Sequence, residues 1–120
     1  MLHLEQVKNN RNLVNQIDWD MTPEEAVRLY LEWGNNWARG NYVIRSKEDV
    51  SHYFVVDTWG KAPKIFLIRR NSDEAKELAE IDMPEDLKQQ FLDSIGHLRG
   101  VYAIEGEIKT WLKKQFNLLN

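Results

Sequence analysis

The chain has 120 residues, of which 42% are hydrophobic and 29% are charged, and its net charge at pH 7 is −3. Chains of this length and composition bury enough apolar surface to fold without cross-links, so we expect residues 1–120 to form a single α+β domain. The sequence contains no cysteine, which excludes disulfides, cysteine metal sites and thiolate nucleophiles. The small negative net charge argues against general polyanion binding.

Nothing in the sequence indicates a membrane or export segment. No run approaches the roughly 20 apolar residues that cross a bilayer. Residues 1–10 also lack the basic and apolar regions of a signal peptide. We therefore expect a cytoplasmic protein with no membrane partner.

The charges are unevenly distributed along the chain. Residues 36–70 contain 7 Lys or Arg against 3 Asp or Glu, whereas residues 71–93 contain 2 against 8. This asymmetry indicates a folded surface with a basic and an acidic side, or simply well-solvated faces.

The N-terminal part contains two candidate helical regions. Residues 4–17 have an apolar pattern broken by polar residues, which indicates one weak helix or two short ones. A stronger start signal follows, because Thr22 is a good N-cap and Pro23 suits the first helical position. This mostly apolar helix is expected to end at Gly34, or about one turn later before Gly40.

The clearest strand signal lies in the middle of the chain. Residues 53–59 and 64–70 are rich in β-branched and aromatic side chains, and a connection containing Gly60 and Pro63 joins them as a hairpin. Apolar side chains fall on both faces of this hairpin. We therefore expect helices on one face and a further helix or a partner chain on the other, so a monomer and a homodimer both stay open.

Two helices are expected next. Residues 73–81 are predicted to form a helix with acidic side chains outward, and Pro84 opens the following one. In that second helix Leu87, Phe91 and Ile95 recur at every fourth position, which is typical of a buried face.

The remaining elements complete the predicted fold. Residues 101–104 form a short apolar run that suits a third strand, and residues 107–117 form an amphipathic helix. We therefore predict an α+β fold in which a small antiparallel sheet, residues 53–59, 64–70 and 101–104, packs against three to five helices.

No catalytic motif is recognisable. The sequence lacks a Gly-rich phosphate loop, a nucleophile elbow and a zinc-protease motif, and its three histidines, His3, His52 and His97, lie far apart. We therefore expect no catalytic residue, cofactor or metal, and we favour a non-enzymatic protein. The open alternative is a small metal- or carboxylate-dependent enzyme, with the candidate residues Asp18, Asp20, Asp57 and His52.

The most unusual segment is residues 33–40, W-G-N-N-W-A-R-G. Its side chains combine stacking surfaces with amide and guanidinium hydrogen bonding, as recognition sites do. The leading hypothesis is a non-enzymatic binding or regulatory module for a protein or a small ligand. The competing interpretation places the Trp side chains in the core, and the sequence by itself favours burial. The candidate binding residues are Trp33, Asn36, Trp37, Arg39 and Trp59.

The hairpin suggests a further alternative, the binding of single-stranded nucleic acid. Its aromatic residues Tyr53, Trp59 and Phe66 lie among several cations, a pattern that suits base stacking and phosphate contacts. No RNP-like motif is present, and lysines around a hairpin loop also protect exposed edges, so nucleic acid is the least favoured partner. The cations concerned are Arg45, Lys61, Lys64, Arg69 and Arg70.

Four stretches carry a resemblance to a known family: DWDMTPE at residues 18–24, YLEWGNNW at 30–37, DTWGKAPK at 57–64 and LIRR at 67–70. They resemble a small family of uncharacterised bacterial proteins of unknown function, found mainly in sulfate-reducing and related anaerobic bacteria. The similarity spans most of the chain, from Asp18 to the final helix. It implies a free-standing bacterial cytoplasmic protein and transfers no catalytic residue.

Overall fold

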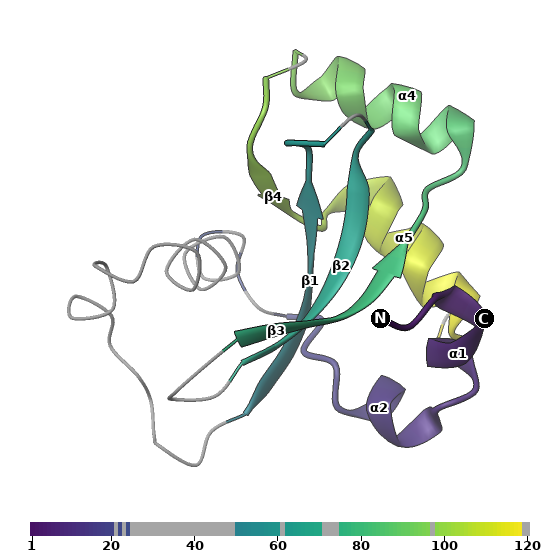
Figure 1. The fold of residues 1–120 in the computed structure, drawn as a ribbon. Coiled ribbons are helices and arrows are strands. Elements are labelled where there is room, and N and C mark those ends of the chain that lie inside the picture. The colour runs from purple at the N-terminus through teal and green to yellow at the C-terminus, as the bar shows by residue number, and fades with distance from the viewer. Residues whose placement is uncertain are drawn as a thin grey trace, which may run out of the picture.

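The computed structural model describes residues 1–20, 22, 24, 50–60, 62–70, 75–96 and 98–118. The elements within these ranges are, in chain order, α1 (Leu4–Lys8), α2 (Arg11–Asn15), β1 (Ser51–Asp57), β2 (Lys64–Arg70), β3 (Ala75–Ile81), α4 (Glu85–Ser94), β4 (Val101–Ala103) and α5 (Gly106–Gln115). The strands form one antiparallel sheet in the order β3-β2-β1-β4, and these helices lie on one side of it (Figure 1). The predicted α+β fold is therefore confirmed.

The hairpin forms the centre of the sheet. β1 pairs with β2 from Ser51 opposite Arg70 to Asp57 opposite Lys64. β2 has the predicted bounds, whereas β1 begins and ends two residues earlier than predicted. It ends at Asp57 because the carboxylate of this residue accepts a hydrogen bond from the backbone N–H of Trp59, which turns the chain out of the sheet.

The predicted helix over residues 73–81 is wrong, because Ala75–Ile81 forms the edge strand β3. Its core-facing residues Ala79 and Ile81 are 0% and 1% exposed. Leu2 forms two backbone hydrogen bonds of 2.9 Å with the outer edge of β3, while β2 pairs with the inner edge. Backbone pairing on both edges outweighs the helix preference of a segment rich in Ala, Glu, Lys and Leu.

The main core lies between the sheet and the helices. Phe54 and Phe116 stack with ring centroids 6.0 Å apart, and Trp19 contacts both rings at 5.5 and 6.2 Å. Burial of these apolar groups fixes α1, α2 and α5 against the sheet. Other core side chains, each at most 2% exposed, are Val7, Val14, Val56, Ile65, Leu67, Ala79, Ile81 and Leu112.

The opposite face of the hairpin is also buried in its middle. Tyr53, Val55 and Ile68 point away from the main core, yet they are only 1%, 0% and 0% exposed. The prediction that both faces of the hairpin are covered is therefore confirmed at these positions.

The C-terminal elements follow the sequence pattern closely. α4 starts directly after Pro84, β4 covers three of the four residues predicted, and α5 begins one residue before the predicted start. Residues 4–17 form two short helices, one of the two forms predicted. The helix expected from Thr22 falls almost entirely outside the described ranges. None of the helices within those ranges is long and apolar enough to span a bilayer.

Candidate functional site

The structure places only one of the sequence-predicted binding residues. Trp33, Asn36, Trp37 and Arg39 lie outside the described residues. Trp59 is described, and its side chain is 61% exposed, so the interpretation that puts this Trp in the core is wrong. Trp59 follows the end of β1, and it lies beside the loop that joins α4 to β4.

Backbone hydrogen bonds hold this region in place. The buried Thr58 donates its N–H to the Gly100 carbonyl at 3.0 Å, and its hydroxyl donates to the same carbonyl at 2.8 Å. In return the Gly100 N–H donates to the Thr58 hydroxyl at 2.6 Å. Thr58 therefore extends the pairing of β1 with β4 by one residue, through both its backbone and its side chain.

Both backbone polar groups of Trp59, its N–H and its carbonyl, form hydrogen bonds. Its N–H donates to the Asp57 carboxylate at 2.8 Å, and its carbonyl accepts from the Arg99 guanidinium at 3.1 Å. The neighbouring Leu98 is 69% exposed. We call Trp59, Leu98 and Arg99 the Trp59 corner. It presents apolar side chains to solvent from a backbone that is already ordered.

The Leu98 side of the corner is anchored to α4. The Leu98 N–H donates to the Ile95 carbonyl at 3.2 Å, and the Tyr102 hydroxyl donates to the Leu98 carbonyl at 2.8 Å. The Tyr102 ring packs edge-on against Phe91, with centroids 5.5 Å apart. The corner is therefore connected through Tyr102 to the inner face of α4.

A second candidate surface is an open groove between α4 and α5. It consists of two adjoining hollows of about 360 and 650 Å³, which share Leu87, Gln90, Gly106 and Glu107. We call this surface the α4–α5 groove. Its other lining residues are Pro84, Asp86, Phe91, Ser94, Glu105, Ile108, Thr110, Trp111 and Lys114.

The groove has an apolar floor and an acidic rim. The rings of Phe91 and Trp111 pack against the main core but stay partly exposed. The carboxylates of Asp86, Glu105 and Glu107 are exposed, and none of them forms an ion pair within the described part of the chain. The groove can therefore accept apolar groups and positive charge together.

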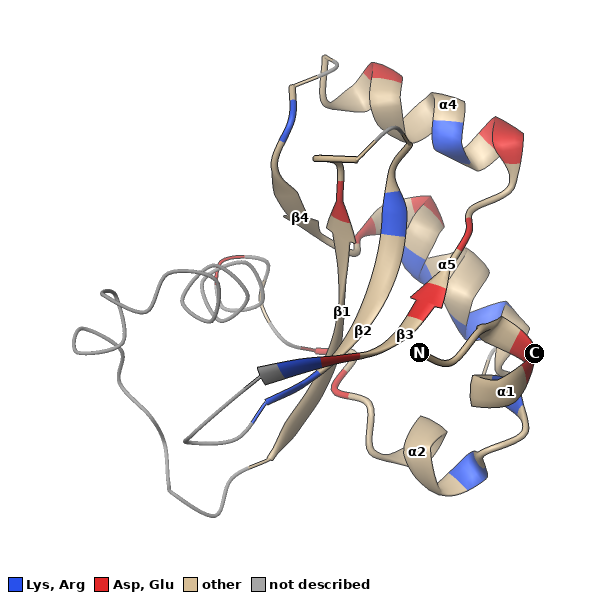
Figure 2. Ribbon diagram, in the orientation of Figure 1, with Lys and Arg blue, Asp and Glu red and all other residues tan. Residues whose placement is uncertain are grey.

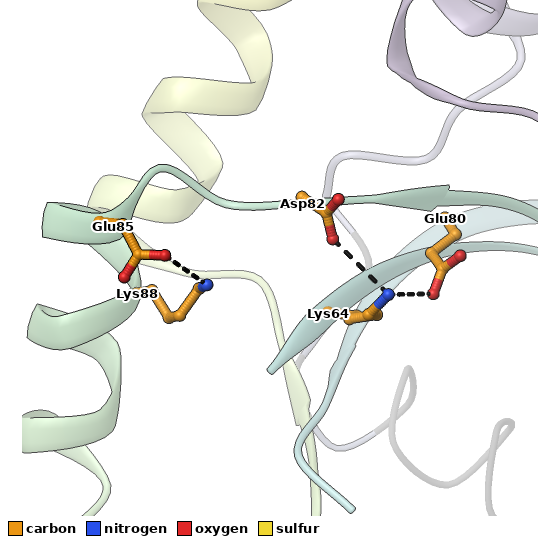
Figure 3. A network of polar contacts seen from close by, with 5 residues as sticks. All are labelled: Lys64, Glu80, Asp82, Glu85 and Lys88. Atoms are coloured by element: carbon orange, nitrogen blue, oxygen red, sulfur yellow. Dashed lines mark hydrogen bonds and ion pairs between the residues drawn. The ribbon is translucent and has the colours of Figure 1, made fainter. Parts of the chain in front are cut away.

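Three other acidic residues, Glu80, Asp82 and Glu85, form ion pairs with lysines (Figure 3). Lys64 lies 2.8 Å from Glu80 and 3.7 Å from Asp82, and its hydrogen bond to Glu80 raises the pKa of the Lys64 ammonium. Glu85 pairs with Lys88 at 2.9 Å. The carboxylates of the groove are thus distinct from Glu80, Asp82 and Glu85, which form these ion pairs.

The hairpin is poorly equipped to stack with bases. Tyr53 is 1% exposed, and Lys64 is engaged with acidic side chains. Arg45 and Lys61 lie outside the described residues. Of the aromatic residues that suggested nucleic-acid binding, Trp59 is the one with a well-exposed ring.

Two of the candidate enzyme residues, Asp18 and Asp57, accept hydrogen bonds from the backbone two residues further along the chain. The Asp18 carboxylate accepts the Asp20 N–H at 2.9 Å, and the Asp57 carboxylate holds Trp59. His52 is 6% exposed, and its pKa is lowered by burial and, to a smaller extent, by the Arg69 charge on the neighbouring strand. Within the described ranges no three His, Asp or Glu side chains gather as metal ligands would.

Sequence reasoning missed Leu98, Arg99 and the α4–α5 groove. The spacing of Leu87 and Phe91 correctly predicted an inward helix face, as did the amphipathic pattern of residues 107–117. Periodicity gives no information on how far apart two helices pack, so it cannot indicate a groove along their contact. Leu98 and Arg99 follow Gly96 in a short loop that has no motif of its own.

Comparison with known proteins finds no protein-family model, curated protein or solved structure that matches this chain.

Proposed function

We infer that this chain is a non-enzymatic binding module that docks onto another protein through the Trp59 corner. The observation that carries this inference is the exposed Trp59 side chain on a backbone held by hydrogen bonds on both sides. Trp and Arg are the residues most enriched at the energetic centres of protein interfaces. Because the backbone is ordered before binding, association loses little conformational entropy.

The shape of the corner favours a protein partner over a small ligand. Small-molecule sites are concave and surround most of the ligand. Trp59 and Leu98 instead project into solvent, with 61% and 69% of their surfaces exposed. A partner with an apolar depression could cover both side chains, while Arg99 reaches a polar group at the edge.

The other sequence-based interpretations stay predictions. Trp33, Asn36, Trp37 and Arg39 are predicted to contribute to the same binding function. The cytoplasmic location and the resemblance to an uncharacterised bacterial family also remain predictions, as does the choice between a monomer and a homodimer.

The test combines capture with titration. Proteins captured on the immobilised wild-type chain are compared with those captured on Trp59→Ser, and a partner lost from the variant is purified and titrated by calorimetry. We expect Trp59→Ser to bind this partner about tenfold more weakly or worse, as interface Trp truncations do. Its melting temperature should stay at the wild-type value because the Trp59 side chain is mostly exposed.

Val50→Ser is the matched control. Val50 is also exposed, at 44%, but it lies just before β1, at the end of the strand opposite Trp59. This variant should bind the partner as the wild type does. Equal binding by wild type and Trp59→Ser would contradict the proposal, and so would unfolding of Trp59→Ser.

A further inference from the structure

The α4–α5 groove combines two features that point to one kind of ligand. Its floor offers partly exposed aromatic rings, and its rim carries carboxylates without a cationic partner in the described part of the chain. We propose that the α4–α5 groove binds a short basic amphipathic segment of a partner protein, with apolar side chains on the floor and Lys or Arg on the rim.

The floor provides the apolar part of the interaction. Leu87 and Ile108 are 8% and 5% exposed and close the bottom of the groove, while Phe91 and Trp111 leave part of their rings uncovered. Covering apolar surface contributes about 25 cal/mol per Å². Two partly exposed rings along one seam therefore favour a segment with apolar side chains on one face.

The rim selects positive charge. Asp86 lies on α4, and Glu105 and Glu107 lie at the start of α5, so carboxylates border the groove on both sides. Lys114 is the single cation among the lining residues that the structure describes. A basic segment would gain charge-assisted hydrogen bonds here, whereas an acidic segment would meet repulsion.

The carboxylate at the N-cap of α5 is not used to cap the helix. Negative charge is stabilised near a helix N-terminus by the helix dipole. Glu105 is the N-cap residue of α5, yet its side chain forms no capping hydrogen bond. Its carboxylate oxygens therefore stay available to a ligand. The net charge of −3 makes a basic partner a better occupant than a second copy of this chain.

The dimensions of the groove limit the ligand to a short segment. The lining residues of α4 run from Asp86 to Ser94, which is about 12 Å along a helix. This length accommodates roughly four residues of extended chain or about two helical turns. Gly106 lines both hollows, and its φ of 53° is a backbone conformation that favours glycine.

The decisive variant is Gln90→Arg. Gln90 is exposed and lines both hollows, so an Arg there fills the groove and pairs with the rim carboxylates. Gln89→Arg is the matched control, because Gln89 is exposed on the same helix and lines neither hollow. Both variants add one positive charge, and Arg is well tolerated in helices.

The probe is a library of short random peptides displayed on phage. The library is depleted on immobilised Gln90→Arg and then selected on the wild-type chain. We expect the recovered peptides to be enriched in Lys and Arg interspersed with apolar residues. Recovery of peptides without an excess of Lys and Arg, or failure to recover peptides above the unselected background, would overturn the proposal.

The recovered peptide is then synthesised and titrated by fluorescence anisotropy. We expect affinity to fall at least about tenfold for Gln90→Arg and to stay unchanged for Gln89→Arg, because only the former blocks a central contact. Equal loss in both variants would show non-specific attraction and would sink the proposal. Loss of self-association instead of peptide binding in Gln90→Arg, seen by sedimentation, would assign the groove to a second copy of the chain.

Rim charge is tested separately with the double variant Asp86→Asn, Glu107→Gln. Peptide affinity should fall about three- to tenfold, and its salt dependence should become weaker, because rim charge pairs are individually modest. Asp20→Asn is the control, since Asp20 is exposed but lines neither hollow. Unchanged affinity and salt dependence in the double variant would contradict the role of the rim.

Discussion

The Trp59 corner and the α4–α5 groove use polar groups in opposite ways. At the corner, hydrogen bonds that involve the side chains of Thr58, Asp57 and Arg99 hold the chain's own backbone, and apolar side chains are left in solvent. In the groove, apolar side chains are largely packed against the core, and the carboxylates have no cationic partner among the described residues. The corner therefore projects apolar side chains from a hydrogen-bonded backbone, whereas the groove offers an apolar floor and carboxylates to a ligand.

The predicted charge asymmetry is only partly open to inspection. Figure 2 shows cations at the end of β2 and the start of β3, and both acidic residues and cations on α4 and α5. Lys64 of β2 is paired with acidic residues of and next to β3. A basic and an acidic side stay a prediction, because residues 36–49 lie outside the described ranges.

The largest expected effect comes from removing the hydrogen bonds between the Thr58 hydroxyl and Gly100, which lie next to the Trp59 corner. Thr58→Val keeps the shape of the side chain but removes the hydroxyl that bonds both backbone groups of Gly100. Leaving the part-buried Gly100 N–H without its acceptor should lower the free energy of unfolding by about 1–2 kcal/mol, measured by urea denaturation.

The same variant separates the two surfaces. Binding of the corner partner should weaken in Thr58→Val because Trp59 is no longer held, whereas binding of the basic peptide to the α4–α5 groove should be unchanged. Equal weakening at both surfaces would show that they are one cooperative unit, which contradicts the contrast drawn above.

A smaller effect, shared by both surfaces, is expected from pH. Burial and the Arg69 charge lower the pKa of His52 in the folded state, so the unfolded chain takes up a proton first as the pH falls. Stability due to this group is complete well above pH 6.5, the ordinary His value, and is lost as the pH falls from there toward the lower folded-state pKa.

The measurement is thermal unfolding across this pH range. His52→Gln cannot titrate, so its melting temperature should depend less on pH than that of the wild type. Because His52 lies at the opposite end of β1 from the corner, acid should lower the stability of the whole domain without a selective effect on Trp59. Identical pH profiles for wild type and variant would refute this role of His52.

The smallest effect is expected from the ion pairs in Figure 3. Lys64 is solvent-exposed, and exposed pairs contribute little because water and salt screen them. Lys64→Met should therefore leave the urea midpoint almost unchanged and leave both binding activities intact. A large loss of stability would mean that the paired acids support β3, and the contrast with the unpaired groove carboxylates would then need revision.

The sequence predictions succeeded where an element depends on residues close together in the chain. They failed where it depends on residues far apart in the chain. Helices α4 and α5 were located within one or two residues because Pro84, Gly96 and a four-residue apolar spacing act within a few turns. β3 was missed because its partner groups come from β2 and from Leu2, which are distant in the sequence. The alternation of Ala79 and Ile81 in β3 with Met83 just after it, all buried, was a strand signal that the helix preference of the segment obscured.

The sequence by itself determined the α+β class, the central hairpin, both C-terminal helices and the presence of apolar groups on both faces of β1 and β2. Only the tertiary structure decided which of these apolar groups are exposed and where unpaired charge collects. The physical reason is that periodicity assigns a side chain to a face, whereas exposure depends on which other element covers that face. Trp59 stays exposed because the bonds of its neighbours hold the end of β1 at the surface, and the groove exists because α4 and α5 meet without filling the space between them.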